Sequence, residues 1–174
     1  MKNLSLWQFA GFVFAVFFGT LLHFIFEWTD WIFLSPISAV NESTWEHMKI
    51  LFFPLLVFAC IQRKYFLQDC PSFWWIKGIG IFVGVWLIPV LFYTYNGAFG
   101  KTPDWLNILF FFVAAGGAFL LETHLFHYGF SLPAPWIAVV LLLFFAAAFT
   151  IFTFFPPKLP IFQDPISGLY GIIQ

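Results

Sequence analysis

The side chains best suited to chemistry gather just before an apolar segment, where Glu42, Glu46, His47 and Lys49 follow one another closely. The whole chain has only 7 Lys and Arg, 8 Asp and Glu, and 4 His, so this short stretch holds a large share of the ionisable groups. Imidazole and carboxylate together are common ligands of zinc, manganese and non-haem iron. A metal ion held by them could activate a water molecule. The stretch therefore indicates a candidate metal site.

A second group of the same kind lies upstream, at His23 and Glu27. Residues four apart on a helix share a face, so His23 can meet Glu27, and Glu42 can meet Glu46 if both are helical. We predict that His23, Glu27, Glu42 and His47 hold a divalent metal, zinc, manganese or iron. The alternative for His23 and Glu27 is an interhelical hydrogen bond with no ligand.

Three residues of the first stretch are predicted to act in catalysis. Glu42 or Glu46 would serve as general base, and Lys49 would contact a phosphate or an oxyanion. A structural alternative exists for Glu46, because Ser43 and Glu46 also fit a capping box that satisfies the first free N–H groups of a helix. This capping role leaves Glu42 and His47 unexplained.

Another cluster, Glu122, His124 and His127, lies near the end of a later apolar run. Histidine is favourable at the negative end of a helix. We therefore interpret this cluster as structural.

The composition is that of an integral membrane protein. Of the 174 residues, 62% are apolar, 25% aromatic and only 9% charged, whereas a soluble domain carries about 25% charged residues. A net charge of -1 provides no basic surface, which excludes nucleic-acid binding. Cys60 and Cys70 lack the spacing of a metal site or a redox motif, so we expect free thiols.

Five segments are apolar enough to cross a bilayer, which requires about 20 residues of helix. We predict an all-α bundle of five transmembrane helices in residues 1–155, with spans at 5–27, 43–62, 74–95, 104–122 and 134–155. The proline-rich residues 156–174 form an irregular interfacial tail. The apolar run 50–61 is too short to cross alone, so its helix must begin near Ser43 and draw Glu46, His47 and Lys49 toward the bilayer.

Positive charges set the expected orientation of these helices. An N-terminus inside and a C-terminus outside the cytoplasmic membrane place four basic residues inside and three outside. The inside group is Lys2, Arg63, Lys64 and Lys77, and the outside group is Lys49, Lys101 and Lys158. We expect Lys77 to snorkel to the membrane surface. The candidate metal site then faces the outer leaflet.

The string from Val40 to Lys49, NES-x-WEH-x-K, resembles a motif in a family of small bacterial multi-pass membrane proteins of unknown function. His23-x-x-x-Glu27-Trp28, Tyr93-Thr94-Tyr95 and the tail with Asp164-Pro165 belong to the same resemblance. Ala39 differs, since proline is expected there. The resemblance brings no established activity and implies only which residues match the family's motif positions, namely His23, Glu27, Asn41, Glu42, Ser43, Glu46, His47, Lys49 and Asp164. We predict Asn41, Ser43, Tyr93 and Asp164 as substrate-binding residues.

These observations favour a metal-dependent hydrolase or transferase that acts on a lipid or a lipid-linked substrate, with membrane lipids as its partners. The same residues would also suit a membrane protein that binds or transports a small ligand or relays protons. A third possibility is an accessory subunit of a membrane complex. The sequence alone leaves open whether the protein is an enzyme.

Overall fold

The structure is a computed structural model that describes residues 3–172 and is built almost entirely of helix. The long helices are α1 (Leu4–Thr29), α2 (Thr44–Phe66), α3 (Phe73–Phe99), α4 (Asp104–Tyr128) and α5 (Pro135–Phe154). Two short 3-10 helices, η1 (Ile32–Leu34) and η2 (Pro160–Phe162), lie in the α1–α2 loop and in the tail. Within residues 3–172 the only extended pairing is an isolated bridge between Gln163 and Tyr170.

All five long helices are long and apolar enough to cross a membrane, which confirms the predicted all-α bundle of five transmembrane helices. Several helices extend beyond the predicted apolar spans, because backbone hydrogen bonding continues into the flanking residues. α2 reaches Phe66, α3 reaches Phe99 and α4 reaches Tyr128. The tail is irregular, as expected.

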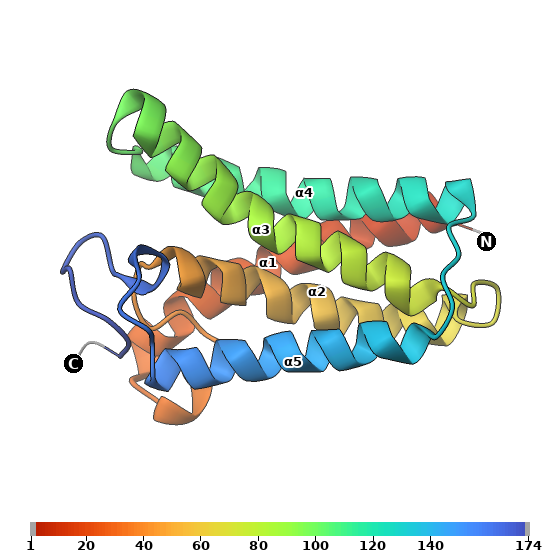
Figure 1. Ribbon diagram of the computed structural model, residues 1–174, viewed down its shortest axis with the longest axis horizontal. Coiled ribbons are helices and arrows are strands. Elements are labelled where there is room, and N and C mark those ends of the chain that lie inside the picture. The colour runs from red at the N-terminus through yellow and green to blue at the C-terminus, as the bar shows by residue number, and fades with distance from the viewer. Residues whose placement is uncertain (1–2, 173–174) are drawn as a thin grey trace.

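Helix α2 occupies the centre of the bundle. It packs against α1, α3 and α5, and it has the largest buried share of the five helices. Figure 1 shows that the two termini lie at opposite ends, and that α3 and α4 diverge from α2 and α5 at one end. We call this end the tail end, because the C-terminal tail lies there, beside the end of α1 and the start of α2.

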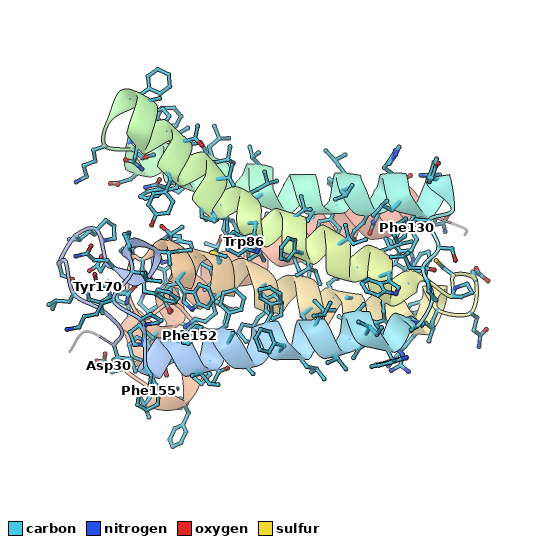
Figure 2. The ribbon with its side chains drawn as sticks, in the orientation of Figure 1. Asp30, Trp86, Phe130, Phe152, Phe155 and Tyr170 are labelled. Carbon is cyan, nitrogen blue, oxygen red and sulfur yellow. The ribbon has the colours of Figure 1, made fainter. Side chains whose placement is uncertain are left out.

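Apolar side chains cover the outer surface of the bundle (Figure 2). Phe155 is 78% exposed and Trp86 is 39% exposed, as expected for residues that face lipid. Helices approach closely where small residues meet, as at Gly84 of α3 and Ala118 of α4. Both cysteines, Cys60 and Cys70, are free.

The start of α2 agrees with the prediction from the sequence. Ser43 is the N-cap, and its Oγ accepts a hydrogen bond from the Glu46 N–H at 3.4 Å. The second half of the capping box is replaced by another contact, because the Glu46 carboxylate accepts a bond from the Val40 N–H at 3.1 Å. Glu46 thus fixes the loop before the helix rather than the cap itself.

Candidate metal centre

Three predicted ligands converge at the tail end of the bundle. His23 comes from α1, Glu42 from the loop before α2, and His47 from the first turn of α2. The Nε2 atoms of His23 and His47 each lie 3.6 Å from Glu42 Oε2. One ligand atom from each of the three residues lies within 4.8 Å of the others. The structure therefore brings together a His₂Glu cluster from residues that the sequence separates.

The His47 ring is oriented by a hydrogen bond of Nδ1, the ring nitrogen that does not face Glu42. His47 Nδ1 lies 2.9 Å from the Ser43 carbonyl oxygen, and because a carbonyl only accepts, we assign the proton to Nδ1. In the neutral ring, Nε2 then directs a lone pair toward the Glu42 carboxylate. Two lone-pair atoms that face each other need a cation between them, either a proton or a metal ion. A hydrogen bond from the other ring nitrogen to a carbonyl is also the usual support of a metal-bound histidine.

The distances in the cluster suit a small divalent metal. Nitrogen and oxygen ligands at about 2.0–2.2 Å around a tetrahedral zinc lie about 3.3–3.6 Å apart. Glu42 Oε2 lies 3.6 Å from Nε2 of His23 and 3.6 Å from Nε2 of His47. Three protein ligands would leave one position for water or substrate.

Glu27, the fourth predicted ligand, is exposed on α1 and lies outside the cluster found among residues 3–172. It is one helical turn beyond His23, near the end of α1, whereas Glu42 reaches the histidines from the loop before α2. The position next to His23 is thus taken by a residue from another segment.

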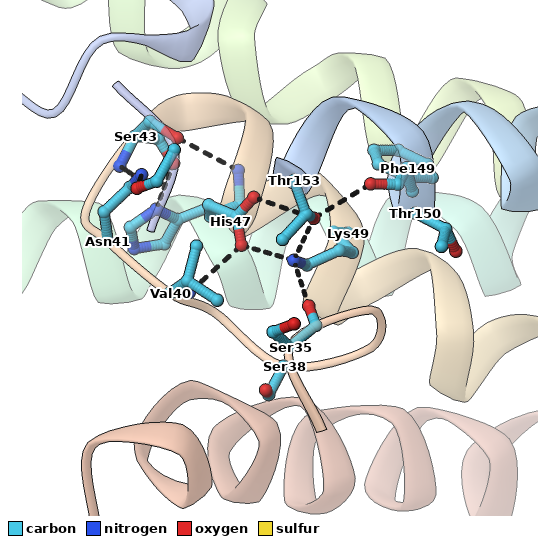
Figure 3. A network of polar contacts seen from close by, with 12 residues as sticks. Ser35, Ser38, Val40, Asn41, Ser43, His47, Lys49, Phe149, Thr150 and Thr153 are labelled. Carbon is cyan, nitrogen blue, oxygen red and sulfur yellow. Dashed lines mark hydrogen bonds and ion pairs between the residues drawn. The ribbon is translucent and has the colours of Figure 1, made fainter. Parts of the chain in front are cut away.

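Glu46 and Lys49, predicted as catalytic, belong to a buried network next to the cluster (Figure 3). Lys49 Nζ contacts Glu46 Oε2 at 2.5 Å and donates to Ser35 O at 2.8 Å and Thr153 Oγ1 at 2.7 Å. These three acceptors match the three N–H donors of a lysine ammonium. The network holds α2, α5 and the α1–α2 loop together, and it leaves Lys49 no free donor for a substrate.

Glu42 and Glu46 do not share a face, contrary to the spacing argument. The helix begins at Thr44, so the rule for residues four apart does not include Glu42. Its side chain turns toward His23 and His47, whereas Glu46 points to Lys49 and Thr153.

Two cavities meet at the cluster, since Glu42 and His47 line both of them. The first has a volume of about 440 Å³ and lies between the start of α2 and the adjoining ends of α3 and α4. The second has a volume of about 360 Å³ and lies between α1 and α4. The cluster therefore stands at the junction of two spaces large enough to hold parts of one ligand.

Among the described residues, none of the predicted substrate residues Asn41, Ser43, Tyr93 and Asp164 lines either cavity, but Asn41 and Asp164 hold segments beside them. Asn41 donates from Nδ2 to Gly171 O at 2.7 Å and accepts from the Ser43 N–H at 2.8 Å. Asp164 accepts from the Ile166 N–H at 3.1 Å and so closes a turn of the tail. This turn carries Ile166, which lines both cavities. Tyr93 is half-exposed on α3, away from the side chains that line either cavity in the described part of the chain.

Sequence reasoning missed the wall formed by α4 and the loop before it. Asp104 and Asn107 line both cavities, and Lys101 and Thr102 line the first. Asn107 Oδ1 and Thr102 Oγ1 are buried and have no hydrogen-bond partner within residues 3–172. The available signal was the spacing of Asp104 and Asn107, three apart at the start of a predicted span.

A second buried ion pair lies near the other end of the bundle. Lys77 contacts Glu122 Oε2 at 2.5 Å and donates to Gln62 Oε1 at 2.8 Å. Gln8 Nε2 donates to the same Glu122 oxygen at 3.2 Å and Gln62 Nε2 to Gln8 Oε1 at 3.1 Å. The prediction that Lys77 snorkels is wrong, because its partners lie in α2 and α4 and its side chain is completely buried.

The neighbouring His127 bonds Thr123 O through Nδ1 at 2.9 Å, and His124 stacks on Tyr128. Both contacts are local to the last turns of α4, which agrees with the structural interpretation of this cluster.

Comparison with known proteins gives a family and no activity. Residues 1–172 match the family described as "Family of unknown function (DUF6512)". The comparisons with curated proteins and with solved structures returned no match. The family match spans nearly the whole chain, including the cluster, both cavities and the tail that borders them. The chain therefore belongs to this family of unknown function.

Proposed function

We propose that this protein is a metal-dependent hydrolase or transferase that acts on a lipid or a lipid-linked substrate. The observation that carries the proposal is the convergence of His23, Glu42 and His47 at the junction of two cavities. Zinc, manganese or iron is the expected ion. A bound ion of this kind polarises an ester or phosphoryl oxygen and lowers the pKa of a bound water.

Asp104 is the second carboxylate that faces both cavities, and we assign it the role of general base in place of the buried Glu46. In hydrolysis the water oxygen bonds to the carbonyl carbon or phosphorus, and the bond to the leaving oxygen breaks. Asp104 would take the water proton and return it to that leaving oxygen. In a transferase, an acceptor hydroxyl would replace the water.

We also propose the cytoplasmic membrane as its location, with the N-terminus inside and the site in the outer leaflet. Lys49 and Lys77 are buried in ion pairs and no longer count as flanking charges. Arg63 and Lys64 remain as an adjacent basic pair at the end of α2, near the α2–α3 loop. Such a pair beside a short loop favours the inner side. Lys2 lies outside the described residues.

The first test is the metal content of the detergent-purified protein, measured by elemental mass spectrometry. We expect about one zinc, manganese or iron ion per chain in the wild type and none in His23→Ala/His47→Ala. His124→Ala/His127→Ala is the matched control, because it also removes two imidazoles and should keep the metal. Wild-type protein that is metal-free and takes up no added ion would overturn the proposal in favour of ligand binding or proton transfer.

A further inference from the structure

The second cavity is graded from polar to apolar along α4. Asp104 and Asn107 line it near the start of the helix, and Phe111 and Phe112 line it further along. At 1.5 Å per residue, Phe112 lies about 12 Å deeper along the helix axis than Asp104. The polar end is thus near the membrane surface and the apolar end within the hydrocarbon region. A lipid in the same leaflet has the same order of polar and apolar parts.

The apolar end of this cavity borders the lipid-facing surface. Phe112 of α4 lines this end, and Ile108 of α4 and Phe24 of α1 line the cavity nearer the cluster; all three are exposed at the surface of the bundle. An acyl chain could therefore move sideways from the bilayer into the space between α1 and α4, without its head group leaving the interface.

The first cavity suits a head group that offers hydroxyls. Thr102 is 4% exposed, and its hydroxyl has no partner among residues 3–172. Asn107 Oδ1 is also buried and unpaired in this part of the chain. Buried polar groups nearly always have a hydrogen-bond partner. Both residues line the first cavity, so a ligand hydroxyl there could donate to Asn107 or accept from Thr102 once the side chain turns toward it.

We infer that the site binds a membrane lipid with a hydroxylated head group. The head group occupies the cavity between α3 and α4, and an acyl chain occupies the cavity between α1 and α4. Glu42 and His47 line both cavities, so the linkage between head group and tail lies at the metal cluster. The inference that a lipid binds here depends only on the two cavities, whereas a reaction at the linkage also requires the proposed function.

The inference is tested with two lipids of equal charge and identical acyl chains, phosphatidylglycerol and phosphatidylethanol. Both are phosphodiesters, and only phosphatidylglycerol carries head-group hydroxyls. Binding to the full-length protein in detergent is measured by native mass spectrometry. We expect the wild type to prefer phosphatidylglycerol by roughly fivefold or more, the effect of about one hydrogen bond.

Thr102→Val and Asn107→Leu should each abolish most of this preference, whereas Trp105→Leu, on the exposed side of α4, should keep it.

A second pair of variants tests the cavity for the acyl chain. Thr20 lines the second cavity, so Thr20→Trp should weaken the binding of both lipids equally. Val13→Trp, on the lipid-facing side of α1, should leave the binding of both lipids unchanged. Equal binding of the two lipids to the wild type would overturn the inference. A preference that survives both Thr102→Val and Asn107→Leu would also overturn it.

The same samples separate this inference from the proposed enzyme activity. Metal content and lipid preference are measured on each preparation, before and after treatment with a chelator. A lipid preference in wild-type protein that is metal-free as purified and takes up no added ion supports the lipid site and refutes metal-dependent catalysis. Bound metal without a lipid preference refutes the lipid site and supports the metal centre.

Discussion

His47 is held by the bond from Nδ1 to the Ser43 carbonyl, and this bond decides what the cluster can bind. It leaves Nε2 facing the Glu42 carboxylate, with His23 Nε2 at an equal distance from the same carboxylate oxygen. Glu42 is the only one of the three that carries a full negative charge in its ordinary form. The affinity for a cation should therefore depend most strongly on this residue.

Glu42→Gln keeps the shape of the side chain and removes its charge. We expect the affinity for zinc or manganese to fall by roughly tenfold to hundredfold or more, since even indirect supports of metal ligands have effects of that size. Titration of the metal-free protein, followed by calorimetry, measures the change. Glu27→Gln is the matched control, because Glu27 is exposed and lies outside the cluster. Equal affinities in wild type and Glu42→Gln would show that Glu42 is not a ligand.

The buried ion pair between Lys77 and Glu122 should affect the stability of the protein when one partner is replaced. Lys77→Met leaves the Glu122 carboxylate buried without its partner, which typically costs about 3–5 kcal/mol. In Lys77→Met/Glu122→Leu the charge is gone as well, so the double variant should be more stable than the single one. Thermal unfolding in detergent compares the two. If the double variant were the less stable of the two, the Glu122 carboxyl would be tolerated without Lys77, with Gln8 as its remaining partner.

Where α3 crosses α4, the two helices pack closely because glycine residues of α3 have no side chain. A Cβ atom added at Gly80 would collide with the side chain of Glu122, which is already fixed by Lys77 and Gln8. The close approach of the two helices and the buried ion pair are therefore one arrangement.

Gly80→Ala should lower the melting temperature by several degrees, because the new methyl group must displace Glu122 or separate the helices. Gly97→Ala is the control on the same helix, since nothing lies within 4 Å of a Cβ at that position. It should be neutral or slightly stabilising, as alanine favours helix over glycine by about 1 kcal/mol. Equal melting temperatures of Gly80→Ala and the wild type would mean that this contact is loose.

In the whole bundle, a metal ion bound to the cluster would link α1 to the start of α2. His23 belongs to α1, and both Glu42 and His47 belong to the next segment. An ion that binds only the folded bundle stabilises it, by about 2.7 kcal/mol when present at 100 times its dissociation constant.

Removal of the metal by a chelator should therefore lower the melting temperature of the wild type. The same treatment should leave His23→Ala/His47→Ala unchanged, because that variant has no ion to lose. Thermal unfolding with and without the chelator, followed by addition of zinc, measures both effects. A chelator that lowers the melting temperature of both proteins equally would point to a metal elsewhere in the chain.

The sequence by itself determined the five helices, because the length of an apolar run sets whether a helix can cross a bilayer. It also predicted which ionisable groups could do chemistry, since such groups are rare in this chain; these are His23, Glu27, Glu42, Glu46, His47 and Lys49. It placed the start of α2 at Ser43 through the required span length. Each of these conclusions depends on properties local to one segment.

Only the tertiary structure decided which of the ionisable groups meet. Glu42 and Glu46 point to different partners because one precedes the helix and the other lies within it. Lys77 finds Glu122 only when α3 packs on α4. The first cavity, with Asn107 and Thr102 in its lining, lies where α3 and α4 diverge from α2 at the tail end. Distances between separate helices depend on packing, and packing is not encoded in the spacing along one helix.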